Sequence, residues 1–175
     1  VAVATLGAAY YQGSGEADAY AKALIMTGNA AGSTIGQLQQ VAVRVSDVVG
    51  TQAAAAEAVA ALAGTGRIAA ADLERLTLVT VLWERATGQA AGEVAKQFAE
   101  LGKAPLDASL KLNESMRYLT QATDSQIRAL EEEGRTTEAA RVAQEAYAGA
   151  MEQRAGQITA RLGAIESAWR GVKDG

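Results

Sequence analysis

Apolar residues recur at helical spacing along most of the chain, most regularly between residues 105 and 147. One set lies before Gly134 and a second set after it: Leu106, Leu110, Leu112, Leu119, Ile127 and Leu130, then Ala139, Val142, Ala143, Ala146 and Tyr147. Gly134 interrupts the period, and Thr136 can cap the helix that follows. The pattern predicts two antiparallel helices that pack through small residues.

Glycines and capping residues divide the chain before residue 105 into shorter predicted helices. We expect them from Glu16 to Thr27, from the capping box at residues 34–37 to about Val49, from Gly50-Thr51 to Gly64, from Asp72 to Gly88, and around Val94, Phe98 and Leu101 up to Gly102. The helix after Asp72 carries apolar residues on nearly every side, from Leu73 to Trp83. A helix of this kind is buried, so we expect it at the centre of the fold.

Residues 105–133 fit either one helix or two. Pro105 suits a first helical turn, and Thr123-Asp124-Ser125-Gln126 matches a capping box that would start a second helix. Because no residue between them forbids a continuous helix, we expect continuity. Farther along, an apolar stripe predicts a last amphipathic helix: Ile158, Leu162, Ile165 and Trp169. Trp83 and Trp169 lie on such stripes and are expected in the core.

Composition favours helices throughout. Ala dominates the 175 residues, Pro occurs once, and aromatic residues make up 5% of the chain. We therefore predict an all-α fold: a multi-helix array of antiparallel helical hairpins, with seven to nine helices of roughly 10–20 residues and no sheet. A continuous helix would measure roughly 260 Å at about 1.5 Å per residue, but glycines interrupt the chain too often for a rod, so we expect a compact bundle.

Charged residues are sparse before residue 70 and frequent after it. Seven precede it, and the remaining 105 residues carry 29: the seven are Glu16, Asp18, Lys22, Arg44, Asp47, Glu57 and Arg67. The shift predicts a charge-poor, Ala- and Gly-rich helical region at residues 1–70 and a charged helical hairpin region at residues 71–175, with one continuous domain as the alternative. The first region is expected to pack against itself, a second copy or a membrane-like surface.

Candidate chemistry is scarce. The chain has no His and no Cys, which excludes Ser-His-Asp and Cys-His catalysis, thiolate zinc sites, disulfides and iron–sulfur clusters. We predict no enzyme activity, no catalytic, cofactor-binding or metal-binding residues, and no cofactor. The net charge of −4 provides no broad basic field, so no specific nucleic acid is predicted as a ligand.

Three glycine motifs and one acidic run have structural explanations. Residues 28–34 lack the spacing and the Lys of a phosphate loop, so a loop and helix cap are expected there. Gly13-Ser14-Gly15 and Gly64-Thr65-Gly66 are expected to be turns. The three carboxylates at residues 131–133 diverge around a helix and cannot converge on a metal ion. Glu131 is expected to pair with Arg135 at a solvated helix end.

Several stretches resemble lambda-type phage or prophage tail length tape measure proteins. They are YYQGSGEADAYAKALIMTGNAAGSTIGQLQQVA, WERATGQAAGEVAKQFAELGKAP, LNESMRYLT, QIRALEEEGR and LGAIESAWRGVKDG, in the same order over nearly the whole chain. The resemblance implies a structural protein of the virion tail lumen that sets tail length during assembly and assists DNA delivery into the host. The implied partners are other copies of the chain and the tail tube, tail tip and tail assembly chaperone proteins. The implied locations are the host cytoplasm during assembly and the host envelope on ejection.

Two other functions stay open. The apolar run from Val1 to Tyr11 is shorter than the roughly 20 residues that span a bilayer, but it and the charge-poor region are compatible with a membrane-active, pore-forming element of the ejection apparatus that contacts the host membrane. A generic helical module that binds a partner helix or peptide is the second alternative. Because the chain starts within an apolar run and lacks an initiating Met, we expect an internal fragment of a longer protein.

Overall fold

The chain forms a bundle of α-helices in the computed structural model, which describes residues 15–30 and 32–173, with side chains omitted at residues 165 and 167–173. A helical segment at residues 15–26 precedes the others: α2 (Ile35–Val49), α3 (Gln52–Ala63), α4 (Leu73–Thr87), α5 (Ala91–Lys103), α6 (Pro105–Met116), α7 (Gln121–Glu132) and α8 (Thr136–Lys173). No described residue lies in a strand, and the predicted all-α fold is confirmed. The apolar run at residues 1–11 and the turn expected at residues 13–15 fall wholly or mostly outside the described residues.

The N-terminal helices form as their sequence signals predict. At the start of α2, the Thr34 hydroxyl accepts a hydrogen bond from the Gln37 amide, and the Gln37 side chain accepts one from the Thr34 amide. This capping box satisfies two amides that the first helical turn leaves without partners. Residues 15–26 run alongside α3 in the same direction. Glu16 accepts a hydrogen bond from the side chain of Gln52, at the start of α3, and Ala23 lies next to Gly64, just past the end of α3.

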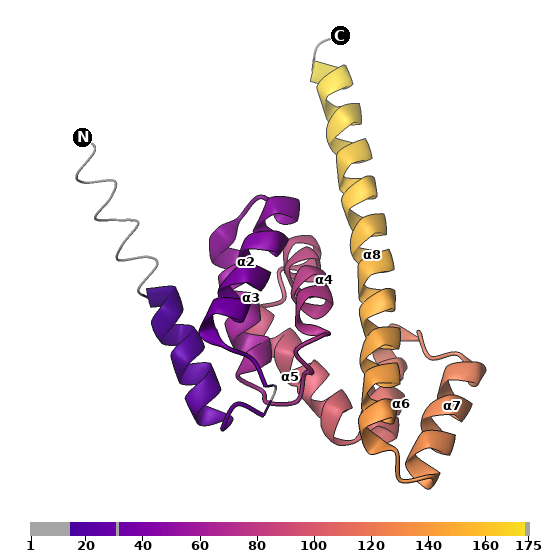
Figure 1. The fold of residues 1–175 in the computed structure, drawn as a ribbon. Coiled ribbons are helices and arrows are strands. Elements are labelled where there is room, and N and C mark those ends of the chain that lie inside the picture. Colours follow the sequence, from indigo (N-terminus) through magenta and orange to yellow (C-terminus); the bar gives the residue numbers. More distant parts are fainter. Residues whose placement is uncertain (1–14, 31, 174–175) are drawn as a thin grey trace, which may run out of the picture.

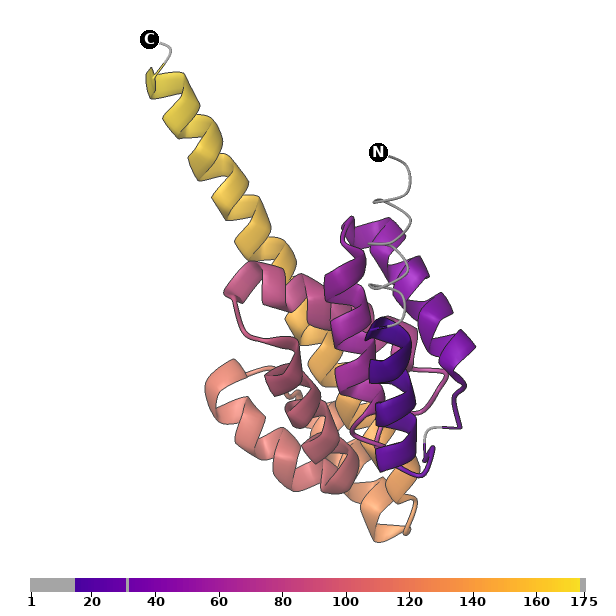
Figure 2. The same ribbon diagram turned by 90° about the vertical axis from the view of Figure 1, so that its left-hand side faces the viewer.

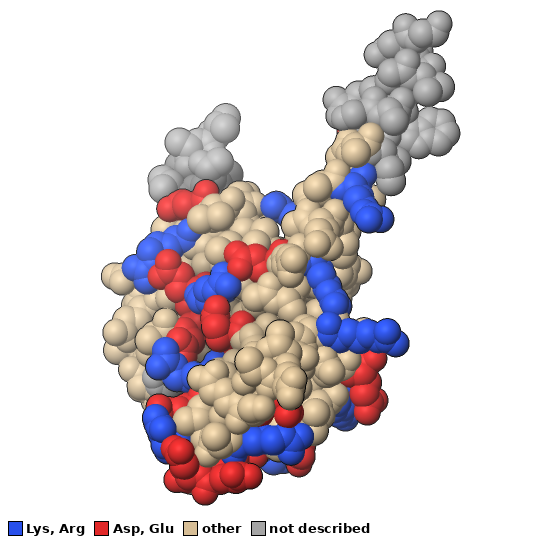
Figure 3. Space-filling view, turned by 90° about the vertical axis from the view of Figure 1, so that its right-hand side faces the viewer, with Lys and Arg blue, Asp and Glu red and all other residues tan. Residues whose placement is uncertain are grey.

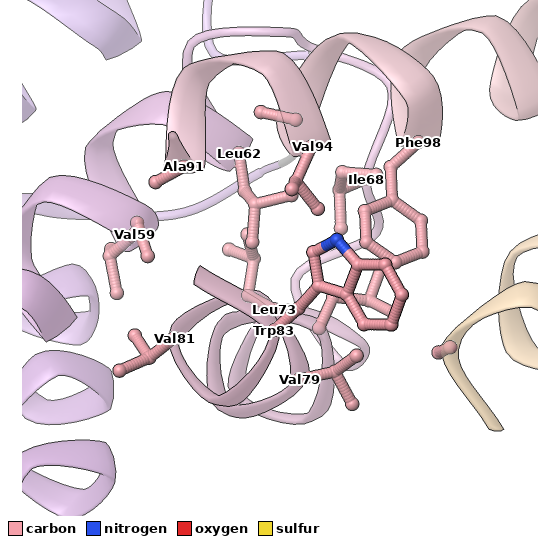
Figure 4. Close-up of a cluster of buried hydrophobic side chains, with 14 of the residues drawn as sticks. Val59, Leu62, Ile68, Leu73, Val79, Val81, Trp83, Ala91, Val94 and Phe98 are labelled. Atoms are coloured by element: carbon pink, nitrogen blue, oxygen red, sulfur yellow. The ribbon is translucent and has the colours of Figure 1, made fainter. Parts of the chain in front are cut away.

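Helix α4 lies at the centre of the bundle, as predicted, in contact with α2, α3, α5 and α8. Its apolar side chains pack with those of α3 and α5 in one hydrophobic cluster (Figure 4). Trp83 is buried within this cluster, and its indole nitrogen donates a 2.7 Å hydrogen bond to Gln89. The predicted core position of Trp83 is therefore confirmed.

The prediction of one continuous helix over residues 105–133 is wrong. Helix α6 ends at Met116, where Arg117 takes a left-handed backbone conformation with a φ of 46°. The Asn113 side chain then accepts a 2.8 Å hydrogen bond from the Leu119 amide, which stabilises the turn. Helix α7 begins after Thr120, whose hydroxyl accepts from the Thr123 amide. The cap of α7 is therefore Thr120 and not the predicted Thr123. The helix breaks before it because a local turn at Asn113 outweighs helix propensity.

Helix α8 is much longer than the 10–20 residues expected, with 38 residues. Its first half packs against α4, α5, α6 and α7, and its remainder extends away from the bundle (Figures 1 and 2). Of the predicted apolar stripe, Ile158 is half-buried and Leu162 is 57% exposed. The side chains of Ile165 and Trp169, including the core position expected for Trp169, lie outside the described residues.

Candidate interaction surfaces

A row of ion pairs joins α8 to α4 and to the residues just before it. Arg75 lies between two carboxylates of α8, with an Nη1–Oε2 distance of 2.7 Å to Glu152 and an Nη2–Oε1 distance of 3.3 Å to Glu145. The hydrogen bond that Arg75 donates to Glu152, more than any other contact, raises the pKa of Arg75 above its usual value. Arg141 of α8 pairs with Asp72 at 3.0 Å. These partly exposed pairs lie along one side of α8, and each contributes little to stability.

A buried amide crosses the same interface. Gln144 is 3% exposed, and its Nε2 donates to the backbone oxygens of Phe98 (3.0 Å) and Arg67 (3.3 Å). A Cβ on Gly102 would lie 3.0 Å from the Arg67 oxygen and 3.1 Å from the Gln144 amide nitrogen. Gly102 is therefore the residue that lets α5 approach the connection before α4 this closely. Contrary to the prediction, Gly102 does not end the helix, because α5 continues to Lys103.

Three aromatic rings meet where α5 and α6 contact α8. Tyr147 makes an edge contact with Phe98 (ring centroids 5.6 Å apart) and a tilted contact with Tyr118 (5.3 Å). The Tyr147 hydroxyl donates to Gln97 at 2.8 Å. Burial, followed by the neighbouring Tyr118, raises the pKa of Tyr147 to about 12. A phenol held neutral in this way serves packing and not proton transfer near neutral pH.

The glycine and glutamate motifs have the structural roles that the sequence suggested, with one correction. At residues 28–34, Gly28 and Asn29 have positive φ and the Asn29 side chain accepts from the Ser33 amide, so this stretch is a loop and a cap. Residues 64–66 form a turn, as predicted. The pairing of Glu131 with Arg135 is wrong. Arg135 instead pairs with Glu133 and Glu138, because the turn at Gly134 directs it toward the start of α8.

Glu131 has a different role, because its carboxylate accepts a hydrogen bond from the Leu106 amide at the start of α6. Arg135 lowers the pKa of Glu138, mainly through a side-chain hydrogen bond.

Acidic and basic side chains are interspersed over the bundle face that Figure 3 shows. That face provides no single-signed field to attract a polyanion.

An apolar groove lies on the outer side of the bundle, between residues 15–26 and α3, with α5 lining one of its two parts. One part measures about 550 Å³ and the other about 530 Å³, and Ala19, Ala60 and Ala61 line both. Tyr20 lines the first part with its side chain fully buried, and its hydroxyl has no hydrogen-bond partner among the described residues. Burial, together with Glu16, raises the pKa of Tyr20 to about 12.

Besides Leu162, Leu110 (40% exposed) and Ile35 (37%), large apolar side chains are exposed in two pairs. Ile25 (79% exposed) and Met26 (74%) end the helical segment beside the groove, and Val43 and Val48 lie on the outer face of α2. Val49, the neighbour of Val48, is buried instead.

The described residues hold no group of three or more Asp, Glu, His or Cys side chains arranged for a metal ion. None of the described helices combines the length and hydropathy that crossing a membrane requires. Sequence reasoning placed no functional residue, and it missed the roles of Arg75, Gln144 and Tyr20. The partners of Arg75 and Gln144 lie far away in the chain, and the Tyr20 hydroxyl has none among the described residues. No local sequence spacing therefore identifies these three residues.

Comparison with known proteins supports a tail protein. Residues 1–128 match the family described as "Prophage tail length tape measure protein". The chain is 32% identical over 171 residues to the tape measure protein of Pseudomonas phage PAJU2, an alignment that covers 98% of this chain and 19% of that protein. The chain thus spans about a fifth of that relative's length. No solved structure matches the chain. With more than half of its residues matched, this helical chain belongs to the prophage tail length tape measure protein family.

Proposed function

We propose that this chain is a structural, non-enzymatic segment of a phage tail and that it contributes to setting tail length. The observation that carries the proposal is α8, which starts within the bundle and continues beyond it as a single helix of 38 residues. At about 1.5 Å per residue, a helix of this length measures roughly 57 Å. The family match supports the tail role, and the geometry supports a compact module joined to a rigid helical spacer.

The bundle determines how much length the segment contributes. Residues 15–155 pack around a core in which many buried positions are Ala, including Ala55, Ala58, Ala143 and Ala148. We propose that the segment measures length in the bundled form and that α8 sets its direction.

The proposed partners are other copies of this chain and the tail tube, tail tip and tail assembly chaperone proteins, with the tail lumen as the proposed location. The exposed apolar residues at Ile25, Met26, Val43, Val48 and Leu162 are the surfaces available for them. Their separation around the bundle fits a segment that contacts more than one neighbour.

An in-frame deletion of the codons for residues 15–155 in the phage or prophage that encodes this chain tests the proposal. Tail length is measured by electron microscopy. A bundled segment predicts shortening on the order of 40 Å, the diameter of a domain of this size, whereas unpacked helices would give roughly 210 Å. The matched variant inserts 28 helix-forming residues after Gly156, and it should lengthen the tail by about 42 Å.

Unchanged tail length in both variants would contradict the length role. Tails of normal length that fail to infect would assign the segment to DNA delivery instead. Shortening near 210 Å would keep the length role and reject the bundled form.

A further inference from the structure

The helical segment at residues 15–26 is attached to the bundle through few buried side chains. Figures 1 and 2 show it in indigo at the surface of the bundle. Tyr20 and Ala23 are its buried residues, and Leu24 is partly buried against the core. Helix α4, by comparison, buries seven of its residues. Because apolar burial stabilises packing in proportion to the area removed from water, residues 15–26 are held less strongly than α4.

Polar contacts add little to this attachment. An exposed 3.4 Å hydrogen bond from Gln52 to Glu16 is the one side-chain hydrogen bond that joins residues 15–26 to another described helix. No ion pair among the described residues involves this segment. Water competes for exposed polar groups, so a single hydrogen bond of this kind contributes little to stability. The segment therefore depends mainly on packing.

The packing of residues 15–26 is itself incomplete. The two parts of the apolar groove, about 550 Å³ and about 530 Å³, lie where the segment meets α3 and α5. The Tyr20 hydroxyl is buried without a hydrogen-bond partner among the described residues, although buried hydroxyls nearly always have one. Burial of an unpaired hydroxyl disfavours the closed position relative to one in which water reaches it. Both features lower the free energy needed to detach the segment.

The connection after the segment has the features of a hinge. Gly28 and Asn29 have φ angles of 58° and 56°. Gly adopts many backbone conformations at little cost, and Asn is among the few other residues that tolerate this left-handed one. Thr34 then begins the capping box of α2. Backbone rotation at Gly28 and Asn29 can therefore move residues 15–26 without disturbing α2.

We propose that residues 15–26, which we call the strap, open as a unit about Gly28 and Asn29 while α2 to α7 and the first half of α8 stay packed. The strap has 12 helical residues, and an isolated helix of this length is marginal in water. The detached strap therefore loses its helix as well. Its opening uncovers the alanine-rich face of α3 that includes Ala56 and Ala60, so the strap controls access to that face. Opening of this kind is a fluctuation of the native state and is compatible with cooperative unfolding of the whole bundle.

Limited digestion of the 175-residue chain with trypsin tests the proposal, because cleavage within a helix requires local unfolding of the backbone. Trypsin cleaves after Lys and Arg, and Lys22 is the only such residue among residues 1–43. Lys22, Arg44 and Lys96 are all exposed on helices, so differences among their cleavage rates report on backbone opening. Cleavage after Lys22 should be at least about tenfold faster than after Arg44 or Lys96. Mass spectrometry identifies the products, and cleavage in the part of α8 beyond the bundle is left out of the comparison.

A disulfide tether provides a second test. A Cβ at Gly64 would lie 3.7 Å from the Cβ of Ala23, close to the roughly 3.8 Å separation found in disulfides. Because the chain has no Cys, Ala23→Cys with Gly64→Cys forms a single disulfide between the strap and the end of α3. The oxidised form should be cleaved after Lys22 at least about tenfold more slowly than the matched pair Ala23→Ser with Gly64→Ser, which cannot be joined.

Tyr20→Ala removes the main anchor of the strap and is the third test. It should speed cleavage after Lys22 at least about tenfold and leave the rates at Arg44 and Lys96 unchanged. Ile25→Ala, at a strap residue that is 79% exposed, is the matched control and should change the Lys22 rate by less than about twofold.

Three results would overturn the proposal. They are equal cleavage rates at Lys22, Arg44 and Lys96 in the unmodified chain, a Lys22 rate that the disulfide does not lower, and an equal gain at all three sites in Tyr20→Ala. The first and third would mean that the strap detaches only when the whole bundle unfolds. The proposal goes beyond the role in tail length and does not depend on it, since every rate is measured on the isolated chain.

Discussion

At the scale of single residues, the molecule depends on a few long-range polar and close contacts that hold alanine-rich surfaces together. Gln144 joins α8 to two backbone oxygens, and Gly102 provides the space in which these groups meet. A periodic pattern marks which face of a helix is buried, but it does not identify the partner across the interface. The sequence therefore predicted the core positions of α4 and missed this junction.

Gly102→Ala should destabilise the protein by about 1–3 kcal/mol, because the new Cβ would lie 3.0 Å from a backbone oxygen that cannot move without displacing the chain. Gly149→Ala is the matched control, since nothing lies within 4 Å of a Cβ at that helical position. It should be neutral or stabilising by up to about 1 kcal/mol. Urea unfolding measures both, and equal effects would contradict the close approach at Gly102.

Two buried tyrosines predict alkaline instability. The pKa values of Tyr20 and Tyr147 are raised to about 12 in the folded protein, above the ordinary value of 10.0. Between these values the unfolded chain loses protons that the folded protein keeps, so deprotonation favours unfolding. Stability should be unaffected below pH 10 and should fall by about 1.4 kcal/mol per pH unit for each tyrosine between pH 10 and 12.

Tyr20→Phe and Tyr147→Phe separate the two contributions, and each should remove its own share of the slope measured by urea unfolding at several pH values. Tyr20→Phe should leave stability at pH 7 unchanged or higher, because the hydroxyl it removes has no partner. An alkaline slope that neither substitution reduces would show that these phenols ionise freely in the folded state.

At the scale of elements, sequence signals worked where they were local and failed where a turn competed with a helix. The α2 capping box and the central position of α4 were predictable from residue type and spacing. The break after Met116 was not, because it depends on Arg117 in a left-handed conformation and on the Asn113 side chain bonded to Leu119. Neither residue is a usual helix terminator, so composition favoured the wrong, continuous helix.

Thr120→Ala should destabilise the protein by about 1 kcal/mol, because the Thr120 hydroxyl caps α7 by accepting from the Thr123 amide. Ser125→Ala, at an exposed position within α7, is the matched control and should change stability by less than about 0.5 kcal/mol. Thermal unfolding compares the two. A larger loss for Ser125→Ala would place the start of α7 elsewhere.

At the scale of the whole molecule, we propose that residues 15–155 fold as one unit rather than as regions divided near residue 70. The hydrophobic cluster includes Val59 and Leu62 before that point and Leu76 and Phe98 after it. A chain cut to residues 1–70 should therefore show no cooperative thermal transition by circular dichroism, because the surfaces of α2 and α3 that contact α4 would be exposed. A cooperative transition in that fragment would support two separate regions.

The all-α fold followed from the sequence, but the reach of α8 did not. Glycines at 149, 156 and 163 all lie within this one continuous helix. A single Gly costs only about 1 kcal/mol in a helix, which the contacts on either side can offset. The resulting shape, a bundle with a helix extending from it, is the basis of the proposed role in tail length.

Small-angle X-ray scattering of the 175-residue chain tests this shape most directly. A bundle with a protruding helix predicts a maximum particle dimension under about 100 Å for the monomer, measured at dilutions where no association occurs. A rod-like scattering profile with a maximum dimension near 260 Å would contradict the account, because it would mean that the helices do not pack against one another in solution.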